Sequence, residues 1–208
     1  MNRCYSDKPM QSSSDRDQLK EILLRRSVRR GEFKLVSGRT SSVYVDGKLT
    51  TLAAAAMPLI GRMFLEKMEQ HGWRPRAIGG LSLGADPIVT AVARESLGRG
   101  PGIDAFLVRK EAKKHGTQKF IEGLEQTEDL PVVIVDDVCT TGGSTADAII
   151  KAQEAGMRIL GAICLVDREA GAREMLKERF GCAFDWIFRL SELLEPASAE
   201  LAATQPPR

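Results

Sequence analysis

Residues 130–145 read Leu-Pro-Val-Val-Ile-Val-Asp-Asp-Val-Cys-Thr-Thr-Gly-Gly-Ser-Thr, and this stretch decides the fold. Its run Val132–Val135 is apolar and rich in β-branched side chains, the pattern of a strand buried on both faces of a parallel sheet. Asp136 and Asp137 stand where we expect that strand to end. The stretch therefore predicts an α/β fold with two carboxylates at the tip of a central strand.

A turn of small and hydroxyl-bearing residues follows the two aspartates. We expect Ser144 or Thr145 to cap a helix that continues to about Ala155. Free backbone N–H groups at such a helix start, together with the helix dipole, favour a bound anion. Gly142 and Gly143 let the backbone approach that anion closely. The turn therefore predicts a cradle for a phosphate group.

The acidic pair separates this cradle from the common phosphate-binding loops. The stretch contains neither Gly-x-x-x-x-Gly-Lys-Ser/Thr nor Gly-x-Gly-x-x-Gly. Two acids before a cradle indicate a ligand with a phosphate at one end and hydroxyl groups about one sugar away. The alternative is an ordinary turn whose acids cap the helix, and the full Asp-Asp-x-x-Thr-x-Gly-x-Ser string favours the ligand.

The same stretch resembles the signature with which type I phosphoribosyltransferases bind 5-phosphoribosyl-1-diphosphate (PRPP). The resemblance implies a parallel sheet flanked by helices, a small N-terminal hood and a flexible catalytic loop. It also implies that Asp136 and Asp137 orient the ribose hydroxyls and hold Mg²⁺, directly or through water. The PRPP-binding residues implied here are Asp136, Asp137, Val138, Cys139, Thr140, Thr141, Gly142, Gly143, Ser144 and Thr145.

Composition and charge limit the classes of function. The chain has 208 residues, 43% of them hydrophobic and 28% charged, which fits a single domain with a substantial core. The net charge of +2 gives no reason to expect nucleic-acid or membrane binding. The sequence shows no apolar segment of membrane-spanning length and no signal-peptide core. We therefore expect a cytoplasmic protein.

The cysteines are spread along the chain and form no Cys-x-x-Cys pair, which argues against a zinc site and against a disulfide framework. Cys139 lies inside the cradle, and we interpret it as a small residue whose backbone matters more than its thiol.

We expect one domain over residues 15–195, between disordered tails at 1–14 and 196–208. Its first helix is expected to begin near Ser14 and to stop at Gly31. Thr50–His71 is expected to form an amphipathic helix, in which Pro58 marks the first turn or a kink.

Two short strands are expected within the hood, which spans about residues 15–49. Residues 31–46 resemble the hood of the orotate phosphoribosyltransferases, which in that family covers the flat pyrimidine base. By that resemblance Tyr44 lies against the base, with Lys48 or Arg39 near an anionic edge. The alternative is a hairpin that supports its own small core.

A glycine-rich turn at residues 80–88 follows a short strand beginning at Ala77. Such a turn suits close approach of an anion, here a diphosphate, and the alternative is a plain connecting loop. Its Gly-Ala-Asp-Pro sequence resembles one subgroup of orotate phosphoribosyltransferases.

Residues 109–123 carry five basic side chains and His115, and a mobile basic loop is the better interpretation. Expelling diphosphate from a sugar needs positive charge on the leaving oxygens. The alternative is that this charged run is ordinary solvated surface. The segment Arg-Lys-Glu-Ala-Lys-x-His-Gly at residues 109–116 is close to the catalytic loop of the orotate phosphoribosyltransferases. That resemblance implies a homodimer with loops shared between subunits. The implied diphosphate contacts are Arg109, Lys110, Lys113 and His115, and the implied catalytic residues are Lys113, Asp137 and His115.

Arg168 follows the apolar strand Arg158–Val166, at the strand end where ligands collect in open α/β sheets. A guanidinium there can pair with a carboxylate through two hydrogen bonds. The alternative is a surface ion pair with Glu169. Val-Asp-Arg-Glu matches the family's segment for the substrate carboxylate. The implied orotate-binding residues are Thr140, Arg168 and Tyr44.

These signatures together cover about residues 15–190 and resemble an orotate phosphoribosyltransferase. The resemblance implies transfer of a phosphoribosyl group from PRPP to orotate, with Mg²⁺, in UMP biosynthesis. Two alternatives remain: a phosphoribosyltransferase for a purine or another base, which shares the cradle, and a non-catalytic PRPP-sensing regulator.

Overall fold

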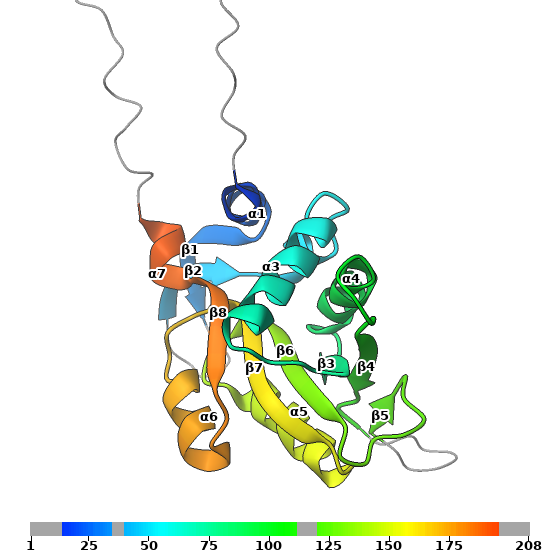
Figure 1. Ribbon diagram of the computed structural model, residues 1–208. Coiled ribbons are helices and arrows are strands. Elements are labelled where there is room, and N and C mark those ends of the chain that lie inside the picture. Colours follow the sequence, from blue (N-terminus) through cyan, green and yellow to red (C-terminus); the bar gives the residue numbers. More distant parts are fainter. Residues whose placement is uncertain (1–13, 35–39, 112–119, 196–208) are drawn as a thin grey trace, which may run out of the picture.

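The structure is a computed structural model, and it describes residues 14–34, 40–111 and 120–195 (Figure 1). Lys113 and His115, which the sequence places in the catalytic loop, lie outside the described residues. The same holds for Arg39 and for nearly all of the two expected tails.

Six strands form the main sheet, in the order β5-β4-β3-β6-β7-β8. Neighbouring strands run parallel, except that β5 is antiparallel to β4. The expected α/β class with a mostly parallel sheet is confirmed. The strands are β3 (Ala77–Leu81), β4 (Asp104–Val108), β5 (Ile121–Glu122), β6 (Pro131–Cys139), β7 (Arg158–Asp167) and β8 (Phe184–Arg189).

The chain order along the sheet reverses between β3 and β6. From β3 the chain proceeds outward through β4 and β5, and from β6 it proceeds outward in the other direction. Loops that leave the carboxyl ends of β3 and β6 therefore diverge, and such a reversal point is where α/β sheets bind their ligands.

Helices cover both faces of the sheet, as Figure 1 shows. One face packs against α1 (Asp15–Arg26), α3 (Met57–Gln70) and α4 (Asp86–Ser96), and the other packs against α5 (Gly143–Glu154) and α6 (Ala172–Phe180). Two further helices in the described residues are short: α2 (Lys48–Thr51) and α7 (Leu190–Leu194). In the part of the chain that the structure describes, no helix is long and apolar enough to cross a membrane.

The core explains the continuous apolar run of β6. Val133 and Val135 belong to the cluster on the α3 and α4 side, whereas Val132 and Ile134 belong to the cluster beneath α5. Successive side chains of a strand point to opposite faces, so a strand covered on both sides must be apolar at every position.

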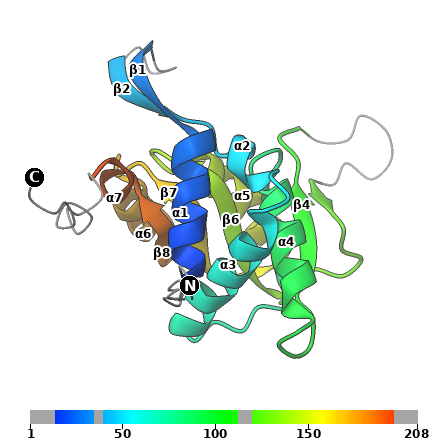
Figure 2. The same cartoon turned by 90° about the horizontal axis from the view of Figure 1, so that it is seen from above.

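The hood contains a hairpin that forms a separate two-stranded sheet, β1 (Val28–Lys34) with β2 (Thr40–Val45). Figure 2 shows this hairpin projecting from the body beyond the end of α1. The Phe33 and Tyr44 rings meet across it, with centroids 5.5 Å apart.

Two expectations about the N-terminal third were wrong. The first helix ends at Arg26, not at Gly31, because Arg29 and Arg30 pair with β2 instead. Residues 50–71 do not form one helix: α2 ends at Thr51 and α3 starts at Met57. Pro58 lies in the first turn of α3, where its missing N–H costs no helical hydrogen bond.

Candidate active site

Asp136 and Asp137 are both buried, at 7% and 8% exposure, near the carboxyl end of β6. We expected the strand to end at these two residues, and it ends two residues later: β6 continues to Cys139 and pairs Asp136 with Cys164 of β7. Two adjacent acids inside a central strand cost desolvation free energy, so they are positioned for something other than packing.

Each oxygen of Asp136 has a hydrogen-bond donor. The Asp137 amide lies 3.0 Å from Oδ1, and the Thr145 hydroxyl lies 3.4 Å from Oδ2. On Asp137, Oδ1 accepts from the Val138 amide at 2.9 Å. These bonds fix the orientation of both carboxylates before any ligand arrives.

Burial is the main cause that raises the pKa of Asp136, to about 7, and the neighbouring charge of Asp137 adds to it. The pair therefore carries unfavourable negative charge that a cation or a hydroxyl donor would relieve. Carboxylate oxygens are the ligands that Mg²⁺ prefers, and Mg²⁺ needs few of them from protein when phosphates complete its shell. Within the described ranges, no group of three or more His, Cys, Asp or Glu side chains is arranged to hold a metal.

The turn between β3 and α4 lies directly against the acidic pair. A Cβ atom on Gly84 would come within 2.7 Å of Asp137 Oδ1 and 2.8 Å of Asp136 Oδ1. The absence of a side chain therefore allows the backbone of this turn to lie against the carboxylates.

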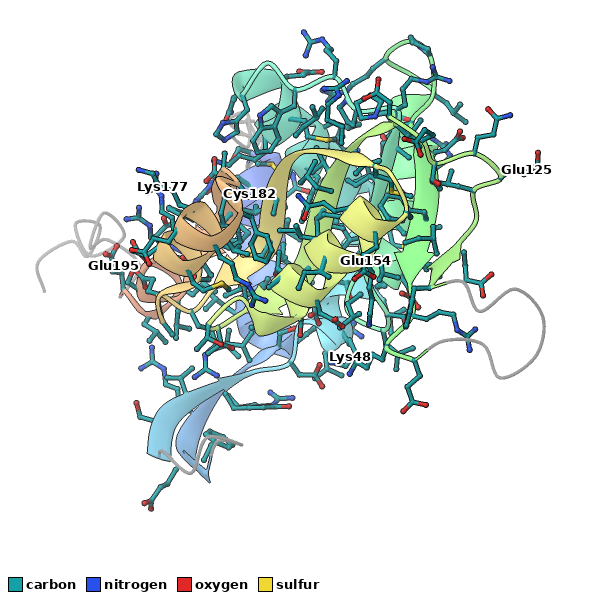
Figure 3. The ribbon with its side chains drawn as sticks, turned by 90° about the horizontal axis from the view of Figure 1, so that it is seen from below. Lys48, Glu125, Glu154, Lys177, Cys182 and Glu195 are labelled. Atoms are coloured by element: carbon teal, nitrogen blue, oxygen red, sulfur yellow. The ribbon has the colours of Figure 1, made fainter. Side chains whose placement is uncertain are left out.

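A second backbone segment reaches the pair from the hood. A Cβ atom on Gly47 would lie 2.7 Å from Asp137 Oδ2. The next residue, Lys48, places its ammonium group 3.8 Å from the same oxygen. Figure 3 shows Lys48 where the hood hairpin meets the body.

The phosphate cradle has the predicted turn but a different cap. Gly142 occupies the N-cap position of α5 with a φ of 84°, so the expected cap by Ser144 or Thr145 was wrong. The Thr145 hydroxyl instead bonds Asp136, which couples the cradle to the acidic pair. Thr141, Gly143 and Ser144 are exposed. Val138 and Thr140 are partly exposed, and Cys139 is buried.

Gly142 meets two constraints. Its positive φ favours glycine, and a Cβ there would lie 2.6 Å from the Met175 methyl group on α6. The turn is thus packed closely against the next helix, while its outer residues face solvent.

Arg168 lies beside the cradle, since its amide donates to the carbonyl of Cys139 at 2.8 Å. Its guanidinium lies 3.4 Å from the carbonyl oxygen of Val43 in β2. Arg168 thereby connects the end of β7 with the hood, next to Tyr44, which is 43% exposed. Its sequence neighbour Glu169 accepts hydrogen bonds from the amide and hydroxyl of Ser191.

The first residues of the expected catalytic loop leave β4. The Arg109 guanidinium lies 3.3 Å from the Glu122 carboxylate, and Lys110 is exposed. The expectation of one loop over 109–123 was wrong in part, because Ile121 and Glu122 form β5 and pair with β4.

Comparison with known proteins decides the family. A model of the phosphoribosyl transferase domain matches residues 50–192. An orotate phosphoribosyltransferase from Mycobacterium tuberculosis is 41% identical over 179 residues, which span 86% of this chain and 96% of that protein. One from Synechocystis is 38% identical over 178 residues, 86% of this chain and 88% of that protein. The crystal structure of the M. tuberculosis enzyme with PRPP has a TM-score of 0.73 at 37% identity and covers 86% of this chain and 99% of that chain.

The chain belongs to the orotate phosphoribosyltransferases. The structure brings together the acidic pair, the expected phosphate cradle and the turn at Gly84. Arg168 lies at the edge of the same group, toward the hood.

Sequence reasoning about this orotate phosphoribosyltransferase missed two contacts at the acidic pair. Gly47 is a single glycine without a motif, and the approach of Lys48 to Asp137 joins residues far apart in the chain. Lys151 also gave no signal in the sequence, although its ammonium group contacts the carbonyl oxygen of Arg109, at the start of the expected catalytic loop. Such contacts depend on tertiary packing, which a local pattern does not encode.

Proposed function

We propose that this protein transfers the phosphoribosyl group of PRPP to orotate, giving orotidine 5′-monophosphate and diphosphate. In the reaction, the bond from the sugar C1 to diphosphate breaks, a bond from C1 to a ring nitrogen of orotate forms, and that nitrogen loses its proton. The observation that supports this most is the buried acidic pair that contacts both the cradle helix and the turn at Gly84.

The acidic pair is assigned to the ribose. Asp136 is tied to its own strand and to Thr145, whereas Asp137 has Oδ2 toward Lys48 and the hood. We assign Asp137 to the ribose hydroxyls and to Mg²⁺, directly or through water. When bound, Mg²⁺ neutralises charge on the diphosphate and orients it.

The two turns are assigned to the two phosphate groups. The turn before α5 and the N-terminus of the helix offer backbone N–H groups and the hydroxyl groups of Thr140, Thr141 and Ser144 to the 5-phosphate, while the Thr145 hydroxyl bonds Asp136. The turn at Gly84 lies against the other side of the acids and is assigned to the diphosphate. In this assignment the sugar lies between the two turns, next to Asp136 and Asp137.

The base is assigned to the space between Arg168, Tyr44 and Thr140. A guanidinium pairs with a carboxylate through two parallel hydrogen bonds, and orotate carries such a carboxylate. Arg168 already bonds the hood strand that carries Tyr44, so both would approach the same ligand.

Catalysis in this proposal needs no covalent nucleophile and depends on position and charge. Arg109, Lys110, Lys113 and His115 are assigned to the diphosphate, with Lys113 nearest the departing oxygen. We further propose a cytoplasmic homodimer in which this loop serves the neighbouring site.

A panel of bases tests the proposal. Purified protein is incubated with PRPP and Mg²⁺ and with orotate, adenine, guanine, hypoxanthine or uracil, and the nucleotide products are separated by chromatography. Turnover of orotate alone is expected. Turnover of a purine but not orotate would replace the proposed substrate, and PRPP binding without turnover would favour a sensor.

Lys113→Ala tests the assignment within the loop. It is expected to reduce turnover much more than PRPP affinity, because the charge is needed when the diphosphate leaves. An equal loss in both would contradict the assigned role.

A further inference from the structure

Lys151 lies in the last turn of α5, and its side chain is only 10% exposed. Its ammonium group lies 2.8 Å from the Asp147 carboxylate, 3.1 Å from the carbonyl oxygen of Arg109 and 2.9 Å from that of Lys110. An ammonium group has three N–H donors, so these acceptors account for all of them.

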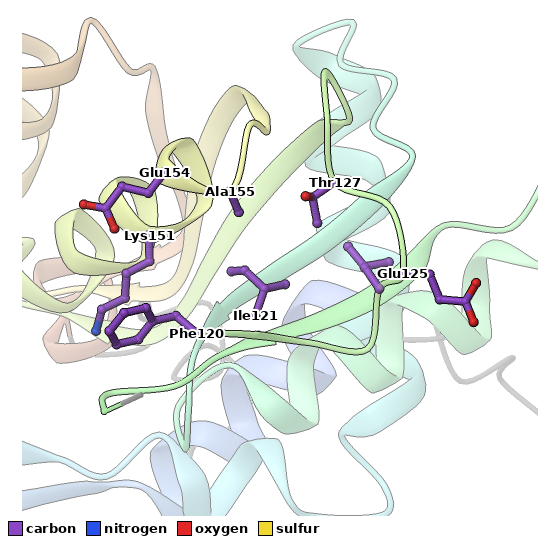
Figure 4. A pocket seen from close by; sticks show the side chains of 8 residues that line it. Phe120, Ile121, Glu125, Thr127, Lys151, Glu154 and Ala155 are labelled. Atoms are coloured by element: carbon purple, nitrogen blue, oxygen red, sulfur yellow. The ribbon is translucent and has the colours of Figure 1, made fainter. Parts of the chain in front are cut away.

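The same ammonium group lies over the Phe120 ring, 4.7 Å from its centroid (Figure 4). Arg109 and Phe120 lie at the two ends of the basic segment, residues 109–120, and the Arg109 amide donates to the Phe120 carbonyl at 2.9 Å. One lysine therefore contacts the chain where it leaves β4 and where it returns to β5. Such a contact combines charged hydrogen bonds with a cation–π interaction.

An open pocket of about 270 Å³ lies beside this contact, lined by Phe120, Ile121, Leu124, Lys151 and neighbouring residues of α5 (Figure 4). The pocket borders Phe120 and Lys151 and not Arg109 or Lys110. Arg109 is also held by the Phe120 carbonyl and by Glu122, and Lys151 adds hydrogen bonds to the carbonyl groups of both Arg109 and Lys110.

Helix α5 relates this contact to the phosphate cradle. The cradle includes the first turn of the helix, and Lys151 lies about 9 Å further along the axis than Thr145. A helix keeps such a separation fixed. The element assigned to the 5-phosphate thus also sets the place of the residues assigned to the diphosphate.

We propose that Lys151 is a positioning residue for the diphosphate half of PRPP, acting through the backbone of Arg109 and Lys110. The inference rests on the proposed function and adds a residue to the same site. Lys151 itself touches neither substrate, because its donors are occupied by Asp147 and the two carbonyl groups.

Lys151→Met is the principal test, because methionine keeps much of the apolar stem and removes the ammonium group. We expect kcat/KM for PRPP to fall about tenfold, the scale of losing a charged hydrogen-bond network, while KM for orotate changes less than about twofold. Lys151→Arg keeps the charge and is expected to recover part of the loss. Lys177→Met is the matched control, since Lys177 is an exposed lysine in the last turn of α6 (Figure 3).

Trypsin gives a second readout that needs no turnover. Cleavage after Arg109 and Lys110, mapped by mass spectrometry, is expected to be faster in Lys151→Met than in the wild-type protein or in Lys177→Met. If no base is turned over, the proposed function fails, and this comparison still decides whether Lys151 anchors the segment.

Three outcomes for Lys151→Met would overturn the inference. They are unchanged tryptic cleavage, unchanged kcat/KM for PRPP, and a rise in KM for orotate as large as the fall in kcat/KM for PRPP. If Lys151→Met does not fold, Asp147→Asn replaces it, because Asp147 is 43% exposed and contributes one of the three acceptors. Its effect is expected to have the same direction and a smaller size, and no change in cleavage or in kcat/KM would again overturn the inference.

Discussion

The ammonium group of Lys48 lies 3.8 Å from Asp137 Oδ2 and 3.1 Å from Asp46 Oδ1, between the hood and the acidic pair. The hydrogen bond to Asp46 raises the pKa of Lys48, and the charge of Asp137 raises it further. A cation of the hood thus offsets part of the negative charge assigned to the ribose site.

Lys48→Met removes that cation. We expect PRPP affinity without Mg²⁺ to fall about two- to fivefold, the range of a partly exposed ion pair. Added Mg²⁺ should recover part of this loss by supplying positive charge at the same place. Isothermal titration calorimetry with EDTA and with Mg²⁺ measures both, and an identical loss in the two conditions would contradict the assigned role.

The buried Asp136 predicts a pH-dependent stability. Burial, with the charge of Asp137, raises its pKa from 3.8 in the unfolded chain to about 7. The folded state therefore binds this proton more tightly, and the resulting stabilisation is complete below pH 3.8 and lost as the pH rises toward 7. Asparagine does not titrate, so Asp136→Asn does not lose this stabilisation. The Tm of the variant minus the Tm of the wild-type protein should therefore increase as the pH rises from 3.8 to 7.

Thermal unfolding without PRPP and Mg²⁺, measured at several pH values, tests this expectation. The exposed Asp104 provides the control substitution, Asp104→Asn. Curves of Tm against pH that run parallel for Asp136→Asn and the wild-type protein would show that Asp136 is not the group responsible.

Gly84→Ala tests the close approach of the turn to the acids. The added methyl group would lie within 2.8 Å of carboxylate oxygens on both aspartates, so the turn or the acids must move. A displacement near 1 Å is expected to lower kcat/KM for PRPP about 100-fold.

Gly98→Ala is the matched control for that change, because a Cβ there meets nothing closer than 3.6 Å. Steady-state kinetics and Tm are measured for both variants. Wild-type kinetics in Gly84→Ala would remove the turn from the proposed site.

Arg168→Lys separates base recognition from PRPP recognition. Lysine keeps the charge but loses the planar pair of donors, so KM for orotate should rise about 10- to 100-fold. KM for PRPP should change less than about threefold, since the cradle is untouched. A larger effect on PRPP than on orotate would place Arg168 at the sugar or its phosphates.

The elements around residues 130–145 were predictable because their signals are local. An apolar run, two acids and two glycines occupy consecutive positions, and the buried strand and the helix formed where expected. The limits of these elements were not predictable. β6 extends through Asp136 because β7 offers a partner there, and Gly142 replaces the hydroxyl cap through its left-handed conformation.

Long-range pairing also decided the N-terminal region. Arg29 and Arg30 fit a helix by local propensity, and they form a strand because Tyr44 and Val43 lie opposite them. The contacts of Lys48 and Lys151 have the same origin, since each joins segments that the sequence separates widely. The sequence shows the chemistry of each side chain, but it does not show which distant residues that side chain contacts.

The hairpin β1–β2 belongs to a different sheet from the strands that carry the cradle and the acids. Mutations in the hairpin can therefore accumulate during evolution without disturbing the strand ladder that carries the residues assigned to the sugar phosphate. A hairpin grafted from a relative with another base preference would be a practical route to altered nucleotide products.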